Sequence, residues 1–127
     1  MTFSIPESPS VNHYYTVARG RKILSAEGRA YKQAVEASIM SQLASNSVTL
    51  RSVRVDGPAI FYVTWHRSRR IGDLDNRLKS CGDSLKGLLF NDDAQIVAIY
   101  AQRLDSPRNG RMVVSVQPFT DHHVFGT

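Results

Sequence analysis

The sequence predicts one small α/β (α+β) domain, in which two helices lie on one mixed sheet and the elements follow the order β-α-β-α-β-β. Three observations support this prediction. A chain of 127 residues with 42% hydrophobic residues can bury a core without disulfides. Two segments repeat apolar residues at helical spacing, and shorter segments between them show the apolar patterns of strands. We expect the domain to cover residues 1–120 and residues 121–127 to form a flexible tail.

The N-terminal half contains one strand, one exposed segment and one helix. Residues 2–5 alternate polar and apolar side chains and stop at Pro6, as a short edge strand does. The next stretch, SVNHYYTVARGRKIL, is expected to be an exposed loop or a basic hairpin. Ser25 is a good N-cap and Glu27 falls in the first turn, which predicts a helix to about Ala44. Its core face should consist of apolar residues four apart: Tyr31, Val35, Ile39 and Leu43.

The C-terminal half contains an interior strand, a second helix and two further strands. Residues 59–65 are apolar on both faces, which favours an interior strand. Residues 76–89 are expected to form an amphipathic helix whose apolar stripe consists of Leu74, Leu78, Cys81, Leu85 and Leu88. Cys81 is therefore interpreted as a core residue. Residues 96–104 and 111–117 have the patterns of strands, and the residues DSPRNG between them are typical of a turn.

The charge of the chain indicates a polyanionic partner. Sixteen Lys and Arg residues against eleven Asp and Glu residues give a net charge of +5, and a positive surface attracts phosphates. No apolar run approaches the roughly 18 residues that span a bilayer, and one cysteine with no N-terminal apolar segment predicts a reducing, cytoplasmic location. The candidate DNA-binding residues are Arg19, Arg21, Lys22, Arg67, Arg69, Arg70 and Arg77.

Carboxylates stand at the two ends of the second predicted helix, within DLDN and NDDA. If residues 72–75 are extended, Asp73 and Asp75 point the same way, because side chains of a strand alternate. Lys79 follows Asp75 by four residues and shares its helix face. Either Asp92 or Asp93 can join them only if the chain returns alongside the helix.

An all-oxygen set of this kind matches Mg²⁺, with Mn²⁺ also possible. Such an ion would relieve the repulsion between carboxylates and could activate a water for attack on a phosphate, while Lys79 stabilises the developing charge. Two ordinary interpretations stay open, since a D-x-D before a helix is commonly an N-cap with a solvated neighbour and NDD is common in turns. A calcium-binding EF-hand loop is excluded because Arg77 occupies its third ligand position.

The stretches PSVNHYY, RGRKILSAEGRAY, DLDNRLKSCGDSL and FNDDAQIV together resemble the RusA-type Holliday junction resolvases of bacteria and their phages, over about residues 9–99. The resemblance implies a RusA-like fold and a Mg²⁺-dependent homodimer that nicks four-way DNA junctions in recombination and repair, in a bacterial cell and encoded by host or phage. It also implies that Asp73, Asp75 and Asp93 are catalytic metal ligands and that Lys79 is catalytic, with Asp92 less firmly matched. Gly72 departs from the pattern, because an arginine often precedes the first aspartate.

Two alternatives to a junction-selective nuclease remain at this point. The first is a non-catalytic basic DNA-binding module, in which the basic segments bind DNA and the aspartates are only capping and turn residues. A general nuclease or an RNA-cleaving enzyme could use the same ion.

Overall fold

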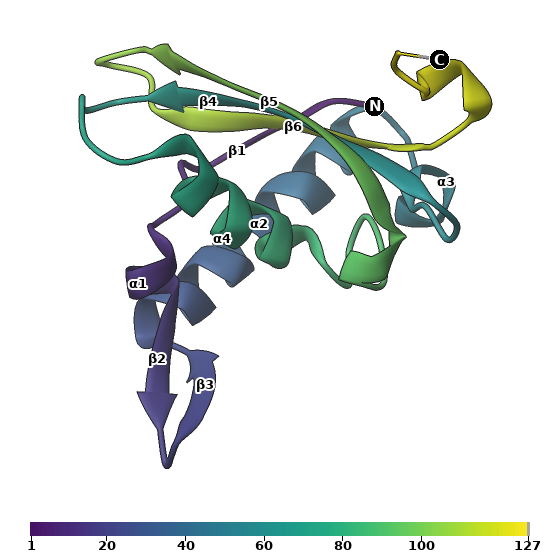
Figure 1. Ribbon diagram of the computed structural model, residues 1–127. Coiled ribbons are helices and arrows are strands. Elements are labelled where there is room, and N and C mark those ends of the chain that lie inside the picture. Colours follow the sequence, from purple (N-terminus) through teal and green to yellow (C-terminus); the bar gives the residue numbers. More distant parts are fainter. Residues whose placement is uncertain (127) are drawn as a thin grey trace.

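The computed structural model describes residues 1–126 and has the predicted α+β architecture, with two long helices on one face of a mixed sheet (Figure 1). The sheet has the strand order β1-β6-β4-β5. Its strands are β1 (Phe3–Ile5), β4 (Ala59–Arg67), β5 (Ile96–Asp105) and β6 (Arg111–Pro118), and the long helices are α2 (Ala26–Ser45) and α4 (Leu74–Leu85). None of the helices within residues 1–126 is long and apolar enough to cross a membrane.

Several short elements add to the predicted order. They are α1 (Val11–Tyr14), β2 (Tyr15–Ala18), β3 (Arg21–Leu24), α3 (Leu50–Val53) and the 3₁₀ turns η1 (Asp93–Gln95) and η2 (Asp121–His123). Strands β2 and β3 pair as an antiparallel hairpin that projects away from the body of the molecule (Figure 1). Its turn places Arg19 and Gly20 at φ 52° and 72°, the backbone of a tight two-residue hairpin turn. The basic hairpin is therefore the correct alternative for this segment.

Strand β4 is the centre of the sheet. It pairs in parallel with β5, where Tyr62 faces Tyr100, and antiparallel with β6, where Val63 faces Val114. The predicted turn between β5 and β6 is present, but these two strands lie on opposite sides of β4 and do not pair. The connection crosses the end of β4, where the Ser106 amide donates to the Arg67 carbonyl at 2.9 Å.

The core lies between the sheet and the two long helices. Alternate residues of β4 face the helices, and Phe61, Val63 and Trp65 are all nearly fully buried. Fully burying one such side chain contributes about 1.5–3 kcal/mol. The predicted helix stripes supply the opposite wall, and Cys81 is completely buried as predicted, with burial raising the pKa of its thiol to about 12.

The start of α4 differs from the prediction. The helix begins at Leu74 rather than Asn76 and ends at Leu85 rather than Leu89, and Asp73 is its extended N-cap residue at φ −95° and ψ 145°. The expectation of an extended backbone over residues 72–75 is therefore wrong. Asp73 occupies the N-cap position but its side chain makes no capping hydrogen bond, so the early start of the helix is better explained by its apolar repeat, which begins at Leu74.

A partly buried polar cluster joins Glu7, two residues after β1, to the end of β4. Glu7 Oε2 accepts hydrogen bonds from Trp65 Nε1 at 2.7 Å and from the Ser68 amide at 3.1 Å, while Oε1 accepts from Ser68 Oγ at 2.6 Å. Burial opposes ionisation of Glu7, but the hydrogen bonds from Ser68 and Trp65 outweigh it and lower the pKa of this carboxyl. The cluster fixes the chain where the arginine-rich segment leaves the sheet.

Gly28 allows the chain before β2 to pass close to the first turn of α2. A Cβ at this position would lie 2.1 Å from the Tyr14 carbonyl oxygen, which accepts a hydrogen bond from the Ser25 amide at 3.0 Å. Gly28→Ala should therefore destabilise the protein by about 1–3 kcal/mol through overpacking. Gly57→Ala is the matched control, because a Cβ there meets no atom within 4 Å. Urea denaturation should show equal stability loss for both variants if the close contact is unimportant.

The Glu7 cluster should also make stability depend on pH. Because the folded state lowers the pKa of Glu7 below 4.5, its ionised form stabilises the fold above that pH, and this contribution is lost as the pH falls through the lower folded value. Glu7→Gln should cost about 1–3 kcal/mol at pH 7, since its amide faces hydrogen-bond donors, and less below pH 4. Denaturation of wild type, Glu7→Gln and the exposed-site control Glu36→Gln at pH 7 and pH 3.5 measures this; a pH-independent difference would contradict it.

Candidate active site

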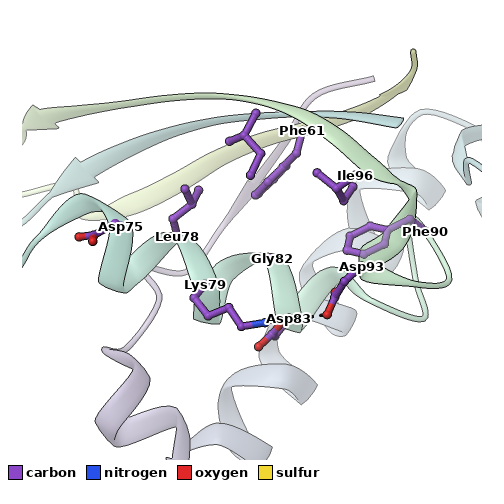
Figure 2. Close-up of a pocket in the computed structure, with 10 residues that line it drawn as sticks. Phe61, Asp75, Leu78, Lys79, Gly82, Asp83, Phe90, Asp93 and Ile96 are labelled. Atoms are coloured by element: carbon purple, nitrogen blue, oxygen red, sulfur yellow. Dashed lines mark hydrogen bonds and ion pairs between the residues drawn. The ribbon is translucent and has the colours of Figure 1, made fainter. Parts of the chain in front are cut away.

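The polar face of α4 lines a cavity of about 310 Å³ beside the sheet. Asp75, Lys79 and Asp83 lie on this face because residues four apart in a helix share one side. Asp93 reaches the same cavity from the loop after α4 (Figure 2). The remaining wall is apolar and consists of Phe61, Leu78, Phe90, Ile96 and Ile99, together with Gly82.

The two neighbouring aspartates after α4 have different surroundings. Asp92 is the N-cap of η1, where its side chain accepts from the Ala94 amide at 2.9 Å and the Gln95 side chain accepts from the Asp92 amide at 2.9 Å. This capping box uses Asp92 locally. Asp93, the first residue of η1, is the one that lines the cavity. The condition that the chain return beside α4 is met for Asp93, which lines the same cavity as Asp75.

Lys79 lies between two carboxylates. Its Nζ is 3.0 Å from Asp83 Oδ1 and 3.8 Å from Asp93 Oδ2, and Lys86 Nζ is 3.7 Å from the same Asp93 oxygen. The other oxygen of Asp83 accepts a hydrogen bond from the Tyr15 hydroxyl. The hydrogen bond to Asp83 is the main cause that raises the pKa of Lys79, so the ammonium stays charged.

The structure brings together only part of the expected metal-ligand set. Asp75 and Asp93 line one cavity, whereas Asp73 does not line it. Within residues 1–126, no three His, Cys, Asp or Glu side chains are close enough to form a ready-made metal cluster. Asp75 lies at the start of α4 and Asp93 beside its C-terminal half, with Lys79 between them (Figure 2). Along α4, Asp75 and Asp83 are separated by about 12 Å at 1.5 Å per residue.

The donor chemistry nevertheless fits a hard divalent cation. The acidic residues of the cavity offer carboxylate oxygens, and Mg²⁺ is commonly held by one or two carboxylates together with water and substrate phosphates. Two lysines beside Asp93 supply the positive charge that a carboxylate cluster otherwise requires. The cavity is thus suited to a cation that is completed by a phosphate ligand rather than enclosed by protein.

The predicted DNA-binding cations fall into two groups. On the hairpin, Arg19, Arg21 and Lys22 are exposed, as are Arg69 and Arg70 after β4. The remaining two arginines make internal contacts.

Arg67 Nε is 2.8 Å from Asp105 Oδ1, and the Arg67 side chain is 11% exposed. The Arg77 guanidinium lies over the Trp65 ring at 5.2 Å and donates to the Ser8 carbonyl at 2.6 Å. Gly72 has φ +97°, a conformation that favours glycine.

Asp83, Lys86 and Tyr15 also belong to the site but were not among the predicted site residues. Asp83 follows Lys79 by four residues on the polar face of the helix, a spacing that favours an ion pair. The ion pair between Lys79 and Asp83 could therefore have been predicted from the sequence. The contact of Tyr15 with Asp83 joins residues 68 positions apart, and no local sequence pattern predicts it.

Comparison with known proteins agrees with this architecture. The family model described as endodeoxyribonuclease RusA matches residues 5–117. Proteins named crossover junction endodeoxyribonuclease RusA from Shigella sonnei and Escherichia coli are each 31% identical over 117 residues, covering 91% of this chain and 92% of each relative. The protein of that name from Enterobacteria phage 82 is 31% identical over 115 residues, covering 89% of this chain and 90% of the relative. The chain therefore belongs to the RusA family.

Proposed function

We propose that this protein is a Mg²⁺-dependent endodeoxyribonuclease that resolves four-way DNA junctions by nicking two opposed strands. The observation that carries the proposal is the cavity shared by Asp75, Lys79 and Asp93, in a chain whose relatives are named crossover junction endodeoxyribonucleases. We further propose that it acts in DNA recombination and repair within a bacterial cell.

The residues around the cavity can divide the chemistry of phosphodiester hydrolysis among them. Asp75 and Asp93 would hold the cation, with Asp73 at the helix N-cap as the third proposed ligand. A divalent cation, when bound, supplies polarisation of the phosphate and a water of lowered pKa. Lys79 donates hydrogen bonds to the phosphate oxygen on which charge develops. The apolar wall of the cavity limits access of bulk water on the sheet side.

Exposed cations at two places support binding of a polyanion. The segment between β4 and α4 leads into the start of α4, and the hairpin projects from the body of the molecule on the side away from the sheet (Figure 1). Phosphate contacts fix the position of a protein on DNA without reading its sequence, which suits a junction whose arms vary. Two equivalent cuts are most simply made by two sites related by two-fold symmetry, so we propose that the active form is a homodimer.

A non-catalytic DNA-binding module is the second candidate. It is favoured by one observation: Lys79 and Lys86 already lie within 4 Å of Asp93, so this carboxylate has protein partners without a cation. The two candidates differ in a single assay. A four-way junction, a linear duplex, a single strand and an RNA duplex are incubated with the protein in Mg²⁺, Mn²⁺ or EDTA, and nicking of the junction alone supports resolution.

Asp75→Asn should lower junction cleavage in Mg²⁺ by at least about 100-fold, because the ligand loses its charge. Junction affinity measured in EDTA should change by less than about threefold, since the fold and the basic surface remain. Glu36→Gln removes one carboxylate from the exposed face of α2 and should cleave normally. Full activity of Asp75→Asn would contradict the proposed catalytic role.

The hairpin cations should account for part of the salt dependence of DNA binding. Each lost phosphate contact lowers the slope of log affinity against log salt by about 0.9, so the double variant Arg19→Ala and Arg21→Ala should lower it by about 2. The control pair is Arg51→Ala and Arg54→Ala, because α3 and its C-cap lie at the far end of the molecule (Figure 1). Equal slopes for wild type and the hairpin variant would exclude the hairpin as a DNA contact.

A further inference from the structure

Asp83 has no role in the proposed chemistry, yet it is the most enclosed carboxylate of the cavity. Its side chain is 11% exposed, compared with 52% for Asp93. Both of its oxygens have protein partners: Oδ1 accepts from Lys79 Nζ at 3.0 Å and Oδ2 accepts from the Tyr15 hydroxyl. Each hydrogen bond occupies one lone-pair site of Asp83, and a cation would also have to reach this enclosed side chain past Lys79 and Tyr15. Asp83 is therefore better suited to hold the Lys79 ammonium and the Tyr15 hydroxyl than to bind the cation.

Lys79 has two acidic neighbours, and their distances are unequal. Its ammonium is 0.8 Å closer to Asp83 (3.0 Å) than to Asp93 (3.8 Å). A lysine side chain has a flexible four-carbon stem and about 2 kcal/mol of rotamer entropy, so its head follows the nearest strong acceptor. If Asp83 lost its charge, the remaining carboxylate within reach of Lys79 would be Asp93. That carboxylate is a proposed cation ligand.

The base of the hairpin supports Asp83 from the other side. Tyr15 is the first residue of β2, and the Lys22 ammonium lies over its ring at 4.2 Å from the ring centroid. The Tyr14 ring packs edge-on against the Tyr15 ring with centroids 4.8 Å apart, and Tyr14 is buried. These contacts fix the Tyr15 hydroxyl against Asp83, so that the carboxylate has one orientation toward Lys79.

We propose that Asp83 is a positioning residue, which holds the ammonium of Lys79 at 3.0 Å so that the contact of Lys79 with Asp93 stays at the longer distance of 3.8 Å. This weaker contact leaves Asp93 more available for a divalent cation, and it keeps Lys79 at the cavity wall for a phosphate oxygen. Lys86, which lies 3.7 Å from the same Asp93 oxygen, is unchanged in every variant of the test, so the test isolates the effect of Lys79. This inference rests on the proposed function. It assigns to Asp83 an effect that passes entirely through Lys79, which distinguishes it from a ligand and from a purely structural residue.

The test is a double-mutant cycle that measures Mn²⁺ binding to the DNA-free protein by electron paramagnetic resonance. Asp83→Asn should weaken Mn²⁺ binding about tenfold, because partners that orient metal ligands typically contribute this much. Lys79→Ala added to Asp83→Asn should restore the affinity to within about twofold of wild type, since the competing ammonium is gone. Glu36→Gln makes the same change in charge outside the cavity and should bind Mn²⁺ like wild type.

Two results of the cycle would overturn the proposal. One is unchanged Mn²⁺ affinity in Asp83→Asn, and the other is an equal loss with and without Lys79, which would make Asp83 a ligand or a folding residue. Thermal unfolding checks that each variant is folded. Should Asp83→Asn not fold, Asp83→Glu takes its place in the cycle, because it keeps the charge but moves it by one methylene group.

A second measurement separates failure of this inference from failure of the proposed function. Lysines are labelled by reductive methylation with ¹³C, which keeps their charge, and the Lys79 resonance is assigned with Lys79→Arg. Asp83→Asn should shift the Lys79 resonance, and Glu36→Gln should leave it unchanged. Absence of Mn²⁺ binding in wild type would count against the proposed function, whereas an unmoved Lys79 resonance in Asp83→Asn would overturn the role of Asp83.

Discussion

The packing of α4 into the hydrophobic core is the constraint on which the candidate site depends. Cys81 and Leu85 are completely buried in this core, and rotation of the helix would expose them at a cost of about 1.5 kcal/mol or more for leucine alone. Because the buried stripe fixes the rotation of α4 about its axis, it also fixes the direction in which the polar stripe points. Asp75, Lys79 and Asp83 therefore face the cavity as a consequence of hydrophobic burial, before any interaction among their charges is considered.

Charge balance in the cavity follows from that arrangement. Asp83 and Asp93 are each within 4 Å of a lysine, so the site does not present the full repulsion that its carboxylates would exert on a DNA backbone. The cations and the carboxylates also differ in burial, with Asp83 enclosed and Lys79 half-exposed. An approaching phosphate thus meets the lysine ammonium while the enclosed carboxylate stays behind it.

The elements with strong periodicity could be predicted from the sequence, and those set by local competition or distant contacts could not. The four-residue repeat of α2 and its Ser25 cap were sufficient, and Ser25 indeed accepts from the Gly28 amide. At Asp73, the strand pattern and the helix pattern made opposite predictions, and the helix begins at the next residue although the Asp73 side chain makes no capping hydrogen bond. The pairing of β4 with both β5 and β6 depends on contacts remote in sequence. The hydrogen bond from Tyr15 to Asp83 likewise depends on how the hairpin packs against α4, which the sequence does not predict.

Arg19 at the hairpin turn illustrates a conflict between backbone stability and surface charge. Its φ of 52° lies in the left-handed region, where a residue with a Cβ costs about 1–2 kcal/mol relative to glycine. Glycine at this position would relax the turn, yet it would also remove an exposed cation from the tip of the projecting hairpin. A selection for heat resistance alone would therefore favour a less basic hairpin, because the conformation that stabilises this turn suits the one residue that has no side chain to carry a charge.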